Sequence, residues 1–259
     1  MTFTLYTVFG FMVIFIATTA GAALVFFFKN DIPDKLNKLF LGMSSGIMLA
    51  ASVWSLLLPA IDGAEGYGRF KFVPAVIGFI LGGIFLVLLD NVALKIYKSE
   101  KNVEKNGFSL KKSLKMFFAI TLHNIPEGLA VGFAFGGARL TGTAEAYLVA
   151  MGLAIGIAIQ NFPEGAAVSL PLKNNFNRKK AFIYGMASGI VEPIAALIGY
   201  IMASSLSAIQ PWFLSFAAGA MVYVVAEELI PQSKTDDSIF GTWGVMIGFA
   251  LMMALDVAL

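Results

Sequence analysis

The chain has 259 residues, of which 58% are hydrophobic, and its mean hydropathy is +0.82. It carries 18 Lys and Arg against 16 Asp and Glu, so only 13% of its residues are charged, about half the share usual in soluble domains. This composition excludes an ordinary soluble enzyme, a nucleic-acid-binding protein and a disordered chain, and it favours a protein whose solvent is lipid. The absence of cysteine excludes disulfides, thiolate metal sites and cysteine nucleophiles, and His123 is the single histidine.

Eight hydrophobic segments are long enough to cross about 30 Å of hydrocarbon as helices. In chain order they lie at about 5–28, 39–61, 72–94, 115–137, 146–170, 181–205, 211–230 and 241–259. The first segment has no basic residue before Lys29, so we expect it to remain as a span and not to be a cleaved signal peptide. The sequence therefore predicts an all-α integral membrane protein with one transmembrane domain, residues 1–259.

Lysine and arginine are concentrated in alternate loops. The loops after the first, third, fifth and seventh spans hold fifteen of them, whereas the other loops hold only Arg69, Lys71 and Arg139. Basic residues accumulate on the cytoplasmic side of membranes, so both termini are predicted to lie outside the cell. We expect a multi-pass protein of the bacterial cytoplasmic membrane, with a flexible cytoplasmic loop at 95–115.

Six of the segments contain glycines four residues apart, a spacing that allows helices to pack closely. These glycines are Gly42/Gly46, Gly78/Gly82, Gly128/Gly132/Gly136, Gly152/Gly156, Gly185/Gly189 and Gly244/Gly248. They predict a compact helix bundle, and any of them could also serve a homodimer interface.

A short motif occurs twice, in the fourth and fifth spans. Residues 123–131 read His-Asn-Ile-Pro-Glu-Gly-Leu-Ala-Val, and residues 160–168 read Gln-Asn-Phe-Pro-Glu-Gly-Ala-Ala-Val. A glutamate at mid-membrane is costly, so Glu127 and Glu164 should face the protein interior. Residues four apart share a helix face, which places His123 with Glu127 and Gln160 with Glu164.

Further unusual residues fall at a similar depth in other spans. Counted from the cytoplasmic ends at 1.5 Å per residue, Glu127, Glu192 and Met48 lie about 14 to 18 Å into the membrane. Glu164 is shallower, but the two motifs overlap in depth. Carboxylates, amides, an imidazole and a thioether with no basic residue at that depth indicate a cation site. This ligand mixture suits zinc, iron(II), manganese or cadmium better than calcium or magnesium.

These residues resemble the ZIP (Zrt/Irt-like) family of divalent-metal transporters, in its GufA-like bacterial branch. The resemblance covers the eight spans and is carried by His123-Asn124-x-Pro126-Glu127-Gly128, Gln160-Asn161-x-Pro163-Glu164-Gly165 and Glu192-Pro193. It implies a 3+2+3 helix arrangement with a mid-membrane site, often for two metals, between spans two, four, five and six. One metal would be bound by Met48, His123, Glu127, Gln160 and Glu164, and a second by Asn124, Glu127, Asn161, Glu164 and Glu192.

The sequence departs from the family pattern at two places. Some members carry an aspartate where Asn161 stands, so the second metal position here has one negative charge fewer. Many members have a histidine-rich loop between spans three and four, whereas residues 95–115 contain no histidine. Metal capture by that loop should be absent or weak.

Other acidic residues near the span ends extend a path through the membrane. Asp62 and Asp256 lie near the outer ends of spans two and eight, on the access side, and Ser55 resembles a family residue on the same route. Asp90, Glu227 and Glu228 lie near the inner ends of spans three and seven, on the release side. For each acid, an interfacial residue hydrated at the headgroups is an equally good interpretation.

The sequence therefore predicts a transporter, not an enzyme, whose partners are the bilayer and a divalent metal such as Zn²⁺ carried as substrate, with no cofactor and no nucleic acid. An intramembrane zinc protease is the alternative, but it needs two histidines, as in His-Glu-x-x-His, and this chain has one. A metal-binding membrane receptor is a further alternative. A metal-free receptor or scaffold leaves three costly carboxylates unexplained.

Overall fold

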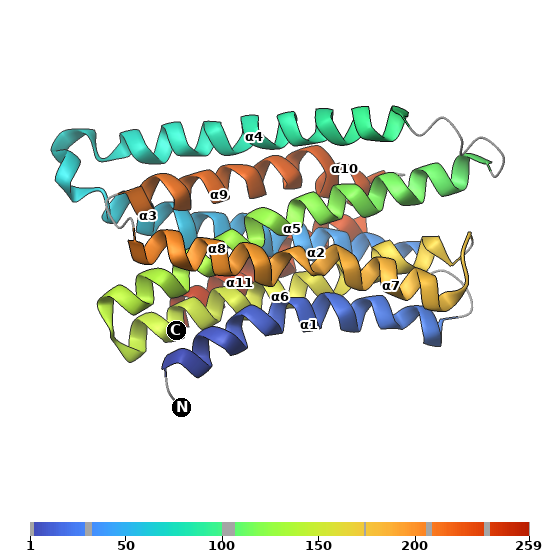
Figure 1. Ribbon diagram of the computed structural model, residues 1–259, viewed down its shortest axis with the longest axis horizontal. Helices are drawn as coiled ribbons and strands as arrows, with labels where there is room; N and C mark the ends of the chain where they lie inside the picture. The colour runs from blue at the N-terminus through green and yellow to red at the C-terminus, as the bar shows by residue number, and fades with distance from the viewer. Residues whose placement is uncertain are drawn as a thin grey trace.

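A computed structural model describes residues 3–28, 33–99, 107–173, 175–205, 209–235 and 239–258, and side chains in these ranges except at 89–99, 107–116, 119, 204 and 205. Figure 1 shows long helices lying side by side along one axis. The elements are α1 (Phe3–Phe27), α2 (Asp34–Ala51), η1 (Ser52–Leu57), α3 (Leu58–Asp62), η2 (Glu65–Phe70), α4 (Phe72–Ser99), α5 (Gly107–Thr141), α6 (Ala144–Leu172), α7 (Arg178–Gly189), α8 (Val191–Ser205), α9 (Gln210–Val224), η4 (Val225–Leu229), α10 (Ile230–Ser233) and α11 (Ile239–Ala258).

Every predicted span falls on helical structure, so the all-α prediction is confirmed for the described residues. Six helical runs there are long and apolar enough to cross a membrane: Thr4–Phe27, Asp34–Asp62, Ala144–Leu172, Arg178–Ala203, Gln210–Ser233 and Ile239–Ala258. The predicted span 72–94 corresponds to α4, in which Phe72–Leu88 forms a shorter apolar helix. The predicted span 115–137 lies within α5, which carries the polar motif and is not one of the six.

The predicted loop at 95–115 is wrong at both its ends. α4 continues to Ser99 and α5 begins at Gly107, while 100–106 lie outside the described residues. Helices do not have to end where apolar residues end, since lysine is a good helix former in water. Hydropathy located the apolar part of each helix and missed its polar extension.

The regular α-helical hydrogen bonding of the predicted sixth span is interrupted at Ile190, whose backbone angles stay helical. α7 ends at Gly189 and α8 begins at Val191. Pro193 has no N–H to donate to the Gly189 carbonyl four residues earlier, which removes one helical hydrogen bond at this point. Pro126 and Pro163, in contrast, lie inside the unbroken helices α5 and α6.

Two other spans contain a π-helical turn that ends two residues before a proline. η1 precedes Pro59 and η4 precedes Pro231. The N–H of Leu58 bonds to the carbonyl of Val53, and that of Ile230 to the carbonyl of Val225, each five residues back. Such turns are rare in proteins, and those that occur often lie near functional sites.

The predicted role of the paired glycines in helix packing is confirmed for the described helices. A Cβ atom added at Gly46 on α2 would lie 2.1 Å from the carbonyl oxygen of Val245 on α11, and one at Gly132 on α5 would lie 2.1 Å from that of Ala196 on α8. Added at Gly82 on α4, it would lie 2.0 Å from the carbonyl oxygen of Phe216 on α9. The main helix pairs are therefore α2 with α11, α5 with α8, α4 with α9 and α1 with α6.

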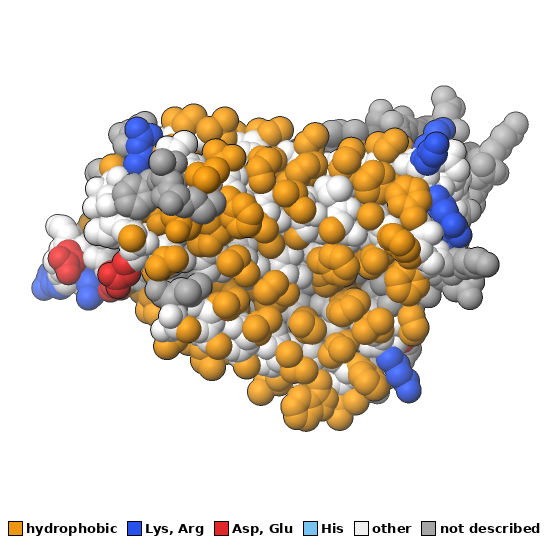
Figure 2. All heavy atoms as spheres, turned by 90° about the horizontal axis from the view of Figure 1, so that it is seen from below, with side chains coloured by type: hydrophobic (Ala, Val, Ile, Leu, Met, Phe, Trp, Pro, Cys, Tyr) orange, Lys and Arg blue, Asp and Glu red, His pale blue; other side chains and the backbone are white. Residues whose placement is uncertain are grey.

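Both chain termini lie at the same end of the bundle, which we call the terminal end (Figure 1). η2 and the turn between α5 and α6 lie there too, while the C-terminal ends of α1 and α6 and the start of α7 lie at the opposite end (Figure 1). Apolar side chains cover the middle of the face in Figure 2, and Lys and Arg side chains gather toward its two ends. This distribution suits a bundle surrounded by lipid.

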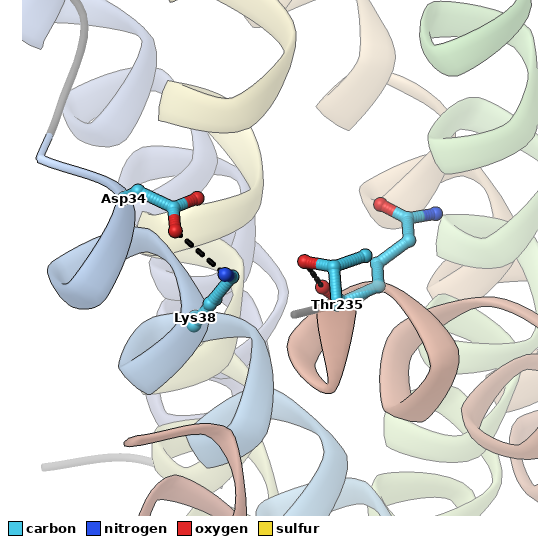
Figure 3. Close-up of polar contacts among 4 residues, drawn as sticks. Asp34, Lys38 and Thr235 are labelled. Carbon is cyan, nitrogen blue, oxygen red and sulfur yellow. Dashed lines mark hydrogen bonds and ion pairs between the residues drawn. The ribbon is translucent and has the colours of Figure 1, made fainter. Parts of the chain in front are cut away.

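Near the start of α2, at the end of the bundle opposite the termini, one lysine has surroundings that the charge count did not predict. Lys38, counted above as a loop lysine, is only 3% exposed, and its Nζ lies 2.6 Å from the carboxylate of Asp34 (Figure 3). Asp34 is itself largely exposed and lies one helical turn earlier. The Lys38 side chain is therefore buried, and its ammonium group is paired with the carboxylate of Asp34, an exposed residue on the same helix.

Candidate metal centre

The structure places all eight candidate ligands inside the bundle. None of them is more than 4% exposed: Met48 on α2, His123, Asn124 and Glu127 on α5, Gln160, Asn161 and Glu164 on α6, and Glu192 on α8. The expectation that the acidic side chains face the protein interior is therefore confirmed.

The two copies of the repeated motif meet between α5 and α6. The Gln160 side-chain amide donates a hydrogen bond from Nε2 to Oε1 of Glu127, over 2.6 Å. Two further oxygens are buried and have no hydrogen-bond partner among the described residues: the second carboxylate oxygen of Glu127, Oε2, and the amide oxygen of Gln160. Both atoms are therefore free to act as ligands.

Asn124 connects the first motif to α8. Its Nδ2 donates to Oε1 of Glu192 over 3.0 Å and to the backbone carbonyl of Ser188 over 2.8 Å. Since the two N–H groups of the amide are both used, its orientation is fixed. The Asn124 Oδ1 and Glu192 Oε2 atoms are left buried, without a hydrogen bond in the described part of the chain.

Three carboxylates lie close enough to interact electrostatically. Glu127 interacts with both Glu164 and Glu192, and Glu164 interacts with Glu192. Asn161, on the same helix as Glu164, neighbours Glu192. Three acids grouped in the buried interior repel one another when ionised, so the arrangement favours a bound cation.

Met48 lies on α2, a helix that packs beside this cluster. The structure gives no contact between the Met48 side chain and the carboxylates. One turn earlier on α2, the Ser44 hydroxyl donates to the backbone carbonyl of Gln160 over 3.3 Å. α2 therefore packs against α6 beside the second motif. Met48 remains a predicted ligand.

No three His, Asp or Glu side chains in the described part of the chain converge closely enough to hold a metal by themselves. The predicted set includes only four such residues, His123, Glu127, Glu164 and Glu192. Its other four members are amides and a thioether, so the acids and the histidine need not form a complete shell.

Two of the three access-side residues are brought together. The Ser55 hydroxyl on η1 donates to Oδ1 of Asp256 on α11 over 2.5 Å. The other carboxylate oxygen, Oδ2 of Asp256, is buried and has no hydrogen bond from a described residue. Asp62, at the end of α3, is exposed and is not part of this contact.

The described release-side residues have different surroundings. Glu228 on η4 lies next to the centre, with its Oε1 at 3.7 Å from Nε2 of His123. Glu227, its neighbour in sequence, is exposed. Asp90 lies on α4, but its side chain is outside the described residues.

One contact to the centre comes from a helix that the sequence analysis did not include. Oγ1 of Thr18 on α1 lies 2.7 Å from Oε1 of Glu192 and 3.2 Å from the carbonyl oxygen of Ile14, and its single proton makes the shorter bond, to Glu192. No sequence signal distinguishes this threonine, because a threonine in an apolar helix ordinarily bonds to the carbonyl four residues back. It is identified only by the packing of α1 against α6 and α7.

The fold and the site define a class: an α-helical membrane protein that encloses a buried centre of carboxylates, amides and one imidazole. Comparison with known proteins narrows this class. A family model described as "ZIP Zinc transporter" matches residues 112–256. The chain belongs to the ZIP family, as the motifs indicated.

Relatives named as zinc transporters occur in animals and bacteria. The chain is 36% identical to zinc transporter ZIP11 of Xenopus tropicalis and 32% identical to zinc transporter GufA of Myxococcus xanthus, with 93% of this chain and 94% of the relative covered in both cases. It is 34% identical to zinc transporter ZIPB of Bordetella bronchiseptica, over 98% of this chain and 81% of the relative. The similarity thus extends well beyond the motif region.

Proposed function

We propose that the protein carries divalent transition-metal ions, zinc first, across the membrane into the cytoplasm through the buried centre between α2, α5, α6 and α8. The observation that carries the proposal is the grouping of Glu127, Glu164 and Glu192 with buried amide oxygens that accept no hydrogen bond from the residues the structure describes. The zinc transporter names of the relatives support the choice of cargo.

The ligand chemistry supports a transition metal over calcium or magnesium. An imidazole nitrogen and a thioether sulfur are poor ligands for hard cations, and both belong to the proposed set through His123 and Met48. Zinc, cadmium, iron(II) and manganese all accept mixed nitrogen and oxygen ligands. The proposed cargo range includes these four metals.

The two metal positions share Glu127 and Glu164. The first adds Met48, His123 and Gln160, and the second adds Asn124, Asn161 and Glu192. Glu192 Oε2 and Asn124 Oδ1 support the second position, because both are buried atoms without another partner among the described residues.

The proposed orientation places the terminal end of the bundle outside the cell. The position of both termini at one end of the bundle supports it, and so does the sequence count of fifteen lysines and arginines between the predicted spans one and two, three and four, five and six, and seven and eight. The eight helical runs would then cross the membrane in the 3+2+3 arrangement, in a bacterial cytoplasmic membrane. Metal would approach past Asp62, Ser55 and Asp256, and leave past Glu228, Glu227 and Asp90.

The proposal is tested by metal uptake into proteoliposomes containing the purified protein, with zinc, cadmium, iron(II) and manganese in competition. Zinc uptake is expected, and replacing Glu127 or Glu164 by Ala should abolish it while the protein remains in the membrane. Glu145→Ala, at an exposed glutamate in the first turn of α6, is the matched control. Wild-type flux in the Glu127→Ala and Glu164→Ala variants would overturn the site assignment.

A further inference from the structure

The carboxylate of Glu192 is held by two donors on different helices. Its Oε1 accepts from the Thr18 hydroxyl on α1 over 2.7 Å and from the Asn124 amide on α5 over 3.0 Å. Its Oε2 has no hydrogen-bond partner among the described residues and is buried. One oxygen is therefore fixed by the protein, and the other is left available for a ligand.

The backbone forces Thr18 into this place. A Cβ atom added at Gly165 on α6 would lie 2.0 Å from the Thr18 carbonyl oxygen, and one added at Gly189 would lie 2.8 Å from the Thr18 Cβ and 3.0 Å from Oε1 of Glu192. Larger residues at either glycine would push α1 away. Three helices thus come together around a threonine that is 0% exposed.

We infer that Thr18 is a positioning residue for the second metal position: its hydroxyl fixes Oε1 of Glu192 so that Oε2 points at the metal. The inference rests on the proposed function, which makes Glu192 a ligand. Thr18 itself binds no metal and acts only through Glu192. α1, which supplies none of the predicted ligands, thereby contributes to the centre.

The chemistry explains why a hydroxyl is needed at this position. Hydrogen bonds from outer groups orient the ligands of a metal, and losing one commonly costs 10- to 100-fold in affinity. Valine has nearly the shape of threonine but cannot donate. In a Thr18→Val variant, Oε1 would keep only Asn124, and the carboxylate could rotate between its two oxygens.

The inference is tested by zinc titration calorimetry on the purified full chain carrying Asn161→Asp, because the second position is expected to be weak or empty without that carboxylate. Thr18→Val, Thr18→Ser, Glu192→Gln and the pair Thr18→Val with Glu192→Gln are each added to this parent chain. Thr18→Val should weaken zinc binding at the position that Glu192→Gln removes, by about 10- to 100-fold. Thr18→Ser, which keeps the hydroxyl, should bind as the parent chain does. In the Glu192→Gln background, Thr18→Val should have no further effect.

The matched control is Thr19→Val, the neighbouring threonine on α1, whose hydroxyl makes no hydrogen bond with the described residues. Added to the same parent chain, it should bind zinc as that chain does. If Thr18→Val does not fold, Thr18→Ala removes the hydroxyl without adding bulk and replaces it in the same comparison.

Unchanged zinc affinity in Thr18→Val would overturn the inference. An equal loss of affinity with Glu192 present and with Glu192→Gln would also overturn it, because the effect would then come from helix packing and not from the carboxylate. A wild-type protein that binds and transports no metal would overturn the proposed function itself. These outcomes are separable, since the last one is seen without any variant.

Discussion

At the scale of single residues, the centre consists of atoms whose hydrogen bonds are only half satisfied. Gln160 and Asn124 use their N–H groups on Glu127 and Glu192, which leaves their amide oxygens without a described partner. In an ordinary core, both ends of a buried amide find partners. Here the protein uses the donors to orient the acceptors.

We expect zinc affinity to rise as the pH increases from 5 to 7. Imidazole and carboxyl groups must lose their protons before they can bind a metal, so protons compete with zinc at His123, Glu127, Glu164 and Glu192. Calorimetry at several pH values, in buffers of different ionisation enthalpy, would measure both the affinity and the protons released. An affinity that is independent of pH, with no proton release, would contradict this expectation.

Replacing Asn161 by Asp should strengthen the second metal position. Two divalent ions bring four positive charges against three from Glu127, Glu164 and Glu192, so the wild type is expected to hold one metal tightly and a second weakly or not at all. The variant supplies the fourth negative charge. A deeper binding site also releases its ion more slowly, so the uptake rate should fall.

Calorimetric stoichiometry and the uptake rate, measured together for the wild type and Asn161→Asp, check this expectation. A wild type that already binds two zinc ions with equal, high affinity would show the charge argument to be wrong.

The candidate ligands could be proposed from sequence because costly polar residues recur within apolar helices. Glu127 and Glu164 are conspicuous in that way, and residue counts from the cytoplasmic ends of their spans predicted that the two motifs overlap in depth. Thr18 could not be proposed, since a buried threonine costs little and its contact with Glu192 spans 174 positions of the chain. A residue whose burial costs little free energy cannot be recognised as functional from sequence, and only the three-dimensional packing of the helices reveals its role.

At the scale of helices, glycine determines which elements pack together. α4 offers a direct test, because the adjacent glycines Gly82 and Gly83 have opposite surroundings. A Cβ atom at Gly82 would lie 2.0 Å from the backbone carbonyl oxygen of Phe216 on α9, whereas one at Gly83 would have no described atom within 4 Å apart from its chain neighbours and its own helix backbone.

Gly82→Ala should therefore destabilise the protein by about 1–3 kcal/mol, the usual cost of overpacking a core. Gly83→Ala should be neutral or stabilise it by up to about 1 kcal/mol, because alanine favours the helix over glycine. Thermal unfolding of both variants in the same detergent measures the difference. Equal destabilisation would mean that α4 and α9 do not pack as described.

Helix boundaries and breaks were the least predictable part of the fold. Pro126 and Pro193 look alike in the sequence, yet the α-helix runs unbroken through the first, while regular α-helical hydrogen bonding is interrupted at Ile190, three residues before the second. The two π-helical turns had no sequence signature that separates them from ordinary turns before a proline. In each case the packing of neighbouring helices determines the local helix geometry, and that packing cannot be inferred from the spacing of residues in the sequence.

At the scale of the whole molecule, the orientation in the membrane can be tested without background labelling, because the chain contains no cysteine. Gly66→Cys lies in η2 at the terminal end, with open space around its Cβ atom. Lys179→Cys lies at the exposed start of α7, at the opposite end.

A membrane-impermeant maleimide added to intact cells should label Gly66→Cys and spare Lys179→Cys. After the cells are broken open, both should react, which controls for accessibility. Labelling of Lys179→Cys alone in intact cells would reverse the proposed orientation, with both termini then inside.

The buried oxygens of the centre also have a consequence for heat resistance. Each buried polar group without a partner costs the folded state about 1–3 kcal/mol, and a bound cation removes that cost in the folded state alone. Zinc at one hundred times its dissociation constant should therefore add about 2.7 kcal/mol to the stability. The melting temperature in detergent should climb with free zinc and drop with a chelator, and it should stay flat in Glu127→Ala, so that heating alone reports whether the centre is loaded.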